Sequence, residues 1–156
     1  MIDAVWSDGS DGAASAALVA ASSLGLEYEL VEGDDPVYAA VAASDATLMF
    51  CVDTGAAVVR RVCELCSVDA ELGGERKGKP LFVVEWDEKG RPRNPRYTAV
   101  SLADWVRRWL YKQGVGVLHV TGDRGPSIEE WVVEFLMEAL DQEAWDGQAE
   151  RESWGK

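Results

Sequence analysis

The feature that most constrains the fold of this chain is a regular alternation of short apolar runs with helix-forming segments. The alternation repeats five times, without an internal repeat and without a linker that would separate two domains. Strands and helices in strict alternation are typical of a parallel sheet covered by helices on both faces. We therefore predict a Rossmann-like three-layer α/β/α fold with a mostly parallel five-stranded sheet.

The elements follow from periodicity and from glycine and proline positions. The strands are expected at residues 2–6, 27–31, 47–52, 81–86 and 115–120, and the helices at 13–24, 37–43, 56–66, from 101 and from 127 to about 140. Ser101 is expected to cap the fourth helix, with Asp104 completing a pattern like a capping box. A single domain over residues 1–140 is predicted, followed by an acidic C-terminal tail over 141–156. The tail carries Trp145 and Trp154, which leaves open whether it is mobile or docks on the domain or on a second subunit.

Charge limits the classes of partner. Fifteen basic residues against twenty-eight acidic ones give a formal net charge of −13. That field repels nucleic-acid backbones and anionic lipid surfaces, so neither partner is expected. A small anionic ligand remains compatible, because local backbone N–H groups can outweigh a distant charge. The absence of a membrane-length apolar run and of a basic leader predicts a cytoplasmic protein.

Three cysteines and one histidine offer little for metal or redox chemistry. Cys63 and Cys66 form a Cys-x-x-Cys pair, but the surrounding sequence resembles the body of a helix, which favours ordinary packing over a metal site. His119 lies inside a strand pattern, so a Ser-His-Asp or Cys-His catalytic set is not expected. The glycine signatures of dinucleotide-binding and Walker phosphate loops are absent.

Ligands of open parallel sheets bind beyond the carboxyl ends of the strands, and three loops here are suited to that position. Glycines let the backbone turn tightly, and helix N-termini offer unpaired N–H groups to an anion. The second loop supports a shared ligand site only if the first and third strands are neighbours, because it then lies beside the first loop. The candidate ligand-binding residues are Ser7, Gly9, Ser10, Asp11 and Gly12 in the first loop, Asp53, Thr54 and Gly55 in the second, and Gly122, Asp123, Arg124 and Ser127 in the third.

Arg124 is the basic residue of these loops and the strongest single candidate. Its planar guanidinium can clamp a carboxylate, phosphate or other oxyanion with two parallel hydrogen bonds. The alternative is an ion pair with Asp123, Glu129 or Glu130. No catalytic residue can be named, and whether the protein is an enzyme stays open.

These loops resemble those of the putative molybdenum carrier family, which is related to the lysine-decarboxylase-like LOG (cytokinin-activating) proteins of the Rossmann-like group. Residues 7–18 resemble the family's opening Ser-Gly-Gly-Gln-Thr-Gly-Ala-Asp-Arg-Ala-Ala-Leu, and similar stretches occur at 45–50, 54–57, 79–84 and 118–124. The chain departs from the family at Ser10, which replaces Gln, at Ala14 and Ser15, which replace Asp-Arg, and at 122–124, where Gly-Asp-Arg stands for Gly-Pro-Arg. The resemblance implies the family's fold more than its ligand.

Three functions are compatible with these observations. The leading one is a binding or carrier protein for a nucleotide-like, pterin-type or oxyanion ligand, with a nucleotide or a molybdenum cofactor-type compound as the candidate cofactor. The second is a LOG-type nucleotide or N-glycosidic hydrolase that uses Asp11 or Asp53. The third is an interaction protein with a vestigial pocket. A homo-oligomer is also left open, since Trp105 and Trp109 could supply a contact surface or fill the core.

Overall fold

The computed structural model describes residues 2–52, 57–67, 78–141 and 143–147. Strands and helices alternate along these residues as predicted. In chain order they are β1 (Ala4–Ser7), α1 (Ala13–Ser23), β2 (Glu27–Leu30), α2 (Pro36–Ala43), β3 (Ala46–Cys51), α3 (Ala57–Ser67), β4 (Leu81–Glu85), α4 (Ala99–Gln113), β5 (Val117–Gly122) and α5 (Pro126–Ala139). The predicted Rossmann-like three-layer fold is confirmed.

The sheet contains five strands in the order β2-β1-β5-β3-β4, and every pairing is parallel. The last strand in the sequence, β5, therefore lies in the centre, with Val5 beside Leu118 on one side and Thr47 beside His119 on the other. The first and third strands, β1 and β3, are not neighbours, because β5 lies between them. The condition under which the second loop would lie beside the first loop is therefore not met. The loop that follows β5 instead lies between the loop that follows β1 and the carboxyl end of β3.

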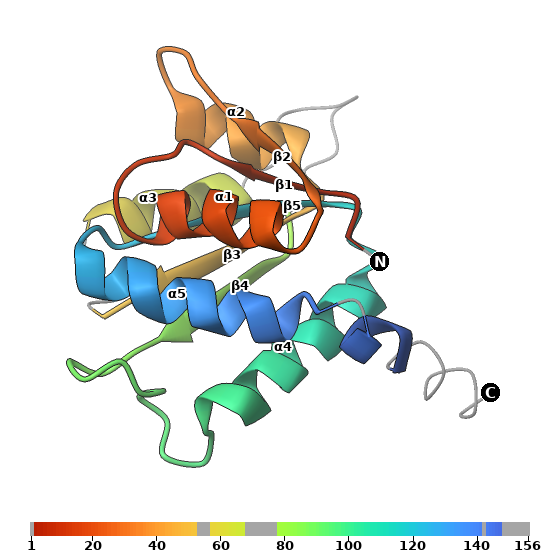
Figure 1. Ribbon diagram of the computed structural model, residues 1–156. Helices are drawn as coiled ribbons and strands as arrows, with labels where there is room; N and C mark the ends of the chain where they lie inside the picture. The colour runs from red at the N-terminus through yellow and green to blue at the C-terminus, as the bar shows by residue number, and fades with distance from the viewer. Residues whose placement is uncertain (1, 53–56, 68–77, 142, 148–156) are drawn as a thin grey trace.

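Helices cover both faces of the sheet (Figure 1). Helices α1, α4 and α5 pack together on one face, and α2 and α3 lie on the other. The larger hydrophobic core lies under α1, α4 and α5, where small alanines of α1 allow close packing on the sheet. A second, smaller core under α2 and α3 includes Met49, Val62 and Cys66. Among the described residues, no helix combines the length and the apolar character that crossing a bilayer requires.

Helix α4 begins earlier than predicted. Thr98, not Ser101, is its N-cap residue, and the two form a reciprocal capping box. The Thr98 hydroxyl accepts a hydrogen bond from the backbone N–H of Ser101 at 3.1 Å, and the Ser101 hydroxyl accepts one from the N–H of Thr98 at 2.9 Å. Ser101 thus has the partner role that the prediction gave to Asp104, one turn into the helix.

The tryptophans of α4 and of the C-terminal segment differ in their surroundings. Trp145 is buried, with its ring centroid 6.4 Å from that of Tyr111, whereas Trp154 lies outside the described residues. Trp109 packs on Phe82, and Trp105 is half exposed. A role of these α4 residues in self-association stays a prediction.

Candidate functional site

The first loop is shaped by its own side chains. The buried Ser7 hydroxyl donates to the carbonyl of Ala14 at 2.6 Å and accepts from the N–H of Gly9 at 3.1 Å. Asp8 accepts hydrogen bonds from the backbone N–H and the hydroxyl of Ser10, at 3.0 and 2.7 Å, and so closes a side-chain turn. Ser7 and Ser10 therefore hold the loop in shape at the end of β1.

The first and third loops touch at Gly12. Its backbone has a φ of 101°, and a β-carbon there would lie 2.6 Å from the Cα of Arg124, so only glycine fits. The N–H of Ala13, the first residue of α1, donates to the carbonyl of Asp123 at 3.0 Å. Residues far apart in the sequence are thus fixed against each other at one edge of the sheet.

Asp123 connects the third loop to the end of β3. Its carboxylate accepts a hydrogen bond from the N–H of Val52 at 2.7 Å, and its own N–H donates to the carbonyl of Phe50 at 2.9 Å. A β-carbon on Gly122 would lie 2.9 Å from the Phe50 carbonyl carbon, which explains why the strand ends in glycine. The second-loop candidates Asp53, Thr54 and Gly55 lie outside the described residues.

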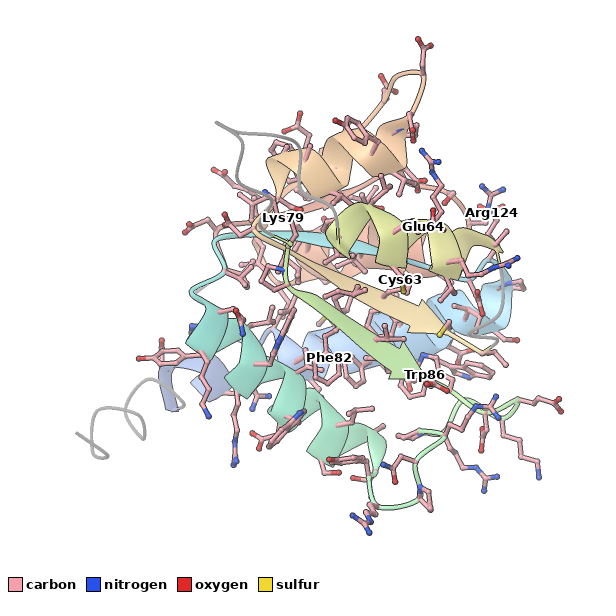
Figure 2. All side chains as sticks on the ribbon, turned by 180° about the vertical axis from the view of Figure 1, so that it is seen from behind. Cys63, Glu64, Lys79, Phe82, Trp86 and Arg124 are labelled. Atoms are coloured by element: carbon pink, nitrogen blue, oxygen red, sulfur yellow. The ribbon has the colours of Figure 1, made fainter. Side chains whose placement is uncertain are left out.

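A shallow hollow of about 560 Å³ opens beside the first and third loops. It is lined by Asp11, Arg124, Gly125, Pro126 and Glu129. Arg124 is exposed, and no acidic side chain of the described residues forms an ion pair with it, in contrast to the alternative considered above. Figure 2 shows Arg124 at the edge of the sheet where the strands end.

Two of the helices that begin at the carboxyl edge of the sheet lack side-chain caps. The N-cap residue of α1 is Gly12 and that of α5 is Gly125, neither with a capping side chain, whereas α2 and α4 are capped by Asp35 and Thr98. Ser127 is exposed in the first turn of α5. In α1 the N–H groups of Ala13 and Ser15 instead donate to the carbonyls of Asp123 and Ser10. The uncapped N-terminus of α5 offers its first backbone N–H groups and a partial positive charge. Together with Arg124, the arrangement can receive an anionic group, while Asp11 and Glu129 repel negative charge from the rest of the hollow.

His119 is not a catalytic candidate at this edge. It is buried in β5, and its Nδ1 lies 3.1 Å from the Thr47 hydroxyl. Burial lowers the pKa of His119 to about 4, and the negative charge of Asp8 opposes this only in part. The imidazole is therefore neutral at physiological pH, and it is buried beside Thr47.

Two of the three cysteines are packing residues of the smaller core. Cys66 and Cys51 are buried there, and burial raises the pKa of both thiols, that of Cys51 to about 12. Cys63 is exposed on α3 (Figure 2). Across the described ranges, no three metal-ligating side chains gather in one place.

Sequence reasoning missed part of the hollow. Gly125, Pro126 and Glu129 line it, and none of them was a candidate. The Gly125-Pro126 pair in the sequence indicates this part of the hollow. Proline is favoured at the first position of a helix, and a glycine before it provides no capping side chain. These residues place the hollow at the start of α5.

Comparison with known proteins bears on the fold. No family model and no curated protein matches the sequence. The chain is similar in structure to a putative molybdenum carrier protein from Syntrophus aciditrophicus SB, with a TM-score of 0.65, 18% sequence identity, and coverage of 89% of this chain and 95% of that one. At this identity the similarity establishes a shared fold, and it agrees with the resemblance noted from the loops.

Proposed function

We propose that this protein binds and carries a small ligand by an oxyanion group, held at the hollow between the first and third loops. The observation that carries the proposal is the meeting of Arg124 with the uncapped N-terminus of α5. Backbone N–H groups and the helix dipole favour an anion at such a terminus, and a guanidinium adds charge-assisted hydrogen bonds. The carrier name of the structurally similar protein agrees with a binding role.

The rest of the hollow suggests what the ligand carries besides its anion. Asp11 and Glu129 line the same space, and carboxylates accept hydrogen bonds. A ligand with hydroxyl or amino donors beside its oxyanion satisfies both requirements. Nucleotide-like and pterin-type compounds combine an anionic group with hydroxyl or amino donors, whereas a ligand that carries only anionic groups does not.

Hydrolysis is less well supported than binding. Of the two acids considered for it, Asp11 lines the hollow and Asp53 lies outside the described residues. The one histidine of the chain is buried and neutral, so it offers no general base to the hollow. The third alternative, a vestigial pocket, predicts that no small ligand binds there.

Arg124→Ala tests the proposal. Thermal unfolding and calorimetric titration with molybdate, phosphate, sulfate, AMP and a pterin identify the ligand class in the unchanged protein, with sodium chloride at matched ionic strength as the control for general salt effects. A ligand at about a hundred times its Kd adds roughly 2.7 kcal/mol of stability. Loss of a charge-assisted hydrogen bond costs about 1.5–3 kcal/mol, so Arg124→Ala should raise Kd about 10- to 100-fold.

Arg96→Ala is the matched control, because Arg96 is also exposed and does not line the hollow. Both substitutions change the net charge equally, so a long-range charge effect would appear in both. Equal loss of affinity in the two variants, or no binding of any probe to the unchanged protein, would contradict the proposal. A ligand-free Tm that falls only in Arg124→Ala would show a structural role instead.

A further inference from the structure

Strand β4 forms one edge of the sheet, and the middle of that edge is open. In the parallel register with β3, the backbone N–H and C=O groups of Phe82 and Val84 face β3, so those of Leu81 and Val83 face outward. Within the described part of the chain, β3 is the only strand that pairs with β4, and nothing hydrogen-bonds to these outward groups. Leu81 and Val83 therefore present unpaired backbone donors and acceptors at the side of the sheet.

The same edge is closed at both of its ends. Before the strand, the N–H of Lys79 donates to the carbonyl of Cys66 at 2.7 Å, and at its end the carbonyl of Glu85 accepts from the N–H of Arg93 at 2.9 Å. Proteins usually protect an edge strand with a proline, a lysine or a bulge, and residues 81–84 contain neither proline nor lysine. The open stretch is thus bounded and has the length of a short added strand.

Two hollows follow the open edge, and we call them together the β4 groove. One, of about 370 Å³, is lined in part by Phe82, Tyr97 and Trp105, and the other, of about 500 Å³, by Leu81 and Trp109. Figure 2 shows Phe82 on the side of β4 that faces α4, and its ring centroid lies 5.4 Å from that of Trp109. Trp105, one turn earlier on α4, is 50% exposed. An aromatic wall therefore lies beside the unpaired backbone groups.

Free positive charge flanks the β4 groove, although the whole chain carries −13. Arg96 adjoins the lining residue Tyr97 near the end of β4, and Lys112 adjoins the lining residue Gln113 near its start. Both are exposed, and neither forms an ion pair with a described residue. The acid that lines the groove, Glu85, is paired with an arginine.

This charge pattern favours an acidic partner over a second copy of the chain. Two copies that paired antiparallel along β4 would bring Arg96 of each toward Lys112 of the other, and both would carry the same net charge of −13. Like charges across an interface oppose association, whereas complementary charges favour it. An extended acidic segment meets both the cations and the unpaired edge.

We propose that the β4 groove binds an extended acidic segment of another protein, which adds a sixth strand to the sheet. The backbone of the segment pairs with Leu81 and Val83, and an apolar side chain enters the hollow beside Trp105. Acidic residues on either side of it lie near Arg96 and Lys112. Strand addition of this kind obtains affinity from backbone hydrogen bonds and specificity from the side chains that alternate along the strand. The surface is independent of the oxyanion site.

Two peptides test the charge requirement in calorimetric titrations of the full chain. The acidic peptide is acetyl-Glu-Asp-Val-Phe-Val-Asp-Glu-amide, and the basic peptide has lysine in place of each acid. The acidic peptide should bind at least about tenfold more tightly, and sodium chloride should reduce the difference. Non-specific attraction to a chain of charge −13 would give the opposite order.

N-methylated forms of the acidic peptide test the backbone pairing. One carries a methyl group on the phenylalanine nitrogen, and the other carries one on each valine nitrogen. Successive N–H groups of a strand point to opposite sides, so only one of the two forms loses donors that face β4. That form should bind at least about tenfold more weakly than the parent peptide, and the other should bind about equally well.

Variants of the protein test the same contacts from the other side. Val83→Pro removes an outward N–H without removing a hydrogen bond to β3, and should raise the Kd of the acidic peptide at least about tenfold. Arg96→Ala with Lys112→Ala should raise it about fivefold. Arg60→Ala with Lys89→Ala is the matched control, because both residues are exposed and line neither hollow, and it should leave the Kd within about twofold.

Amide hydrogen exchange locates the bound peptide. The amide hydrogens of Leu81 and Val83 should exchange at least about tenfold more slowly in the complex, whereas those of Phe82 and Val84, which already face β3, should change little. This measurement and the methylated peptides use the unchanged protein, so they decide the outcome even if Val83→Pro does not fold.

The proposal is overturned if the acidic peptide does not bind, if the basic peptide binds as tightly, or if both methylated forms bind alike. Unchanged exchange at Leu81 and Val83 in the complex would overturn it as well. A dimer in solution that Val83→Pro converts to a monomer would assign the edge to a second copy of this chain, against the proposal.

Discussion

His119 and Thr47 form a polar pair between the central strands β5 and β3. Their side chains lie 3.1 Å apart in a region where both residues are buried. The imidazole is held neutral there, because burial lowers its pKa to about 4 from an ordinary value of 6.5. At the scale of one residue, this pair couples the stability of the sheet to pH.

The single histidine makes that coupling measurable. An unfolded chain takes up a proton on His119 near pH 6.5 and the folded chain only near pH 4, so stability present at neutral pH is lost as pH falls through this window. The unfolding free energy should decrease by about 2 kcal/mol between pH 7 and pH 5, as judged by urea unfolding. His119→Gln should flatten the dependence, and an equal slope in both proteins would refute the explanation.

At the scale of elements, Arg107 joins α4 to the end of α5. Its buried guanidinium donates to the carbonyls of Ala139 and Glu138, at 3.3 and 2.6 Å, and pairs with Asp104 at 2.9 Å. Carbonyls at the end of a helix lack partners within the helix. The arginine satisfies those of α5 and fixes the angle at which the two helices meet.

Arg107→Ala should therefore lower the unfolding free energy by about 3 kcal/mol, because it leaves the carbonyls of Glu138 and Ala139 without their donor and removes one of the two arginine partners of Asp104. Arg107→Lys should recover less than half, since an ammonium cannot reach three acceptors in one plane. Arg108 pairs with the same Asp104 but is exposed, so Arg108→Ala should cost less than about 1 kcal/mol. Urea unfolding compares all three, and similar losses for both alanine variants would contradict this reading.

At the scale of the whole molecule, the position of Trp145 bears on where the domain ends. The predicted boundary at residue 140 stays a prediction, but Trp145 is 4% exposed and belongs to the larger core. The segment around it is short, and the N–H of Trp145 donates to the carbonyl of Asp141 at 2.9 Å. A buried tryptophan beyond α5 suggests that the cooperative unit extends past that helix.

Trp145→Ala should destabilise the protein by about 3–5 kcal/mol, the usual cost of removing a large buried aromatic side chain. Trp105→Ala is the matched control, because Trp105 is 50% exposed and its loss should cost far less. Thermal and denaturant unfolding measure both. Equal stability of Trp145→Ala and the unchanged protein would place the end of the domain at α5.

The sequence pattern along the chain predicts the strands and helices of this fold and the edge of the sheet where its loops meet. The alternating apolar runs located all five strands, and the glycine-bearing turns located the edge where the loops meet. Strand order was not readable, because it depends on which distant runs pair, and β5 enters between β1 and β3. The helix-joining role of Arg107 was also hidden, since a charged residue within a helical pattern normally indicates a solvent-facing side chain.

The candidate site was only partly predictable for a similar reason. Arg124 and Gly12 stood out by residue type, but their contact joins loops that follow the first and last strands. Residues 81–86 have the pattern of an apolar strand, and nothing in their neighbours along the chain indicates that β4 lies at the edge of the sheet. Such features arise only when separate segments are brought together.

The central place of β5 also has a consequence for biosynthesis. The β1–β2 and β3–β4 pairs share no hydrogen-bonded ladder until β5 joins them, and β5 is the last strand to be translated. A growing chain on the ribosome therefore carries two half-sheets, each with an inner edge that awaits the same strand. Unpaired strand edges template wrong association, so we expect the nascent chain to be most prone to aggregation in the interval before β5 has emerged.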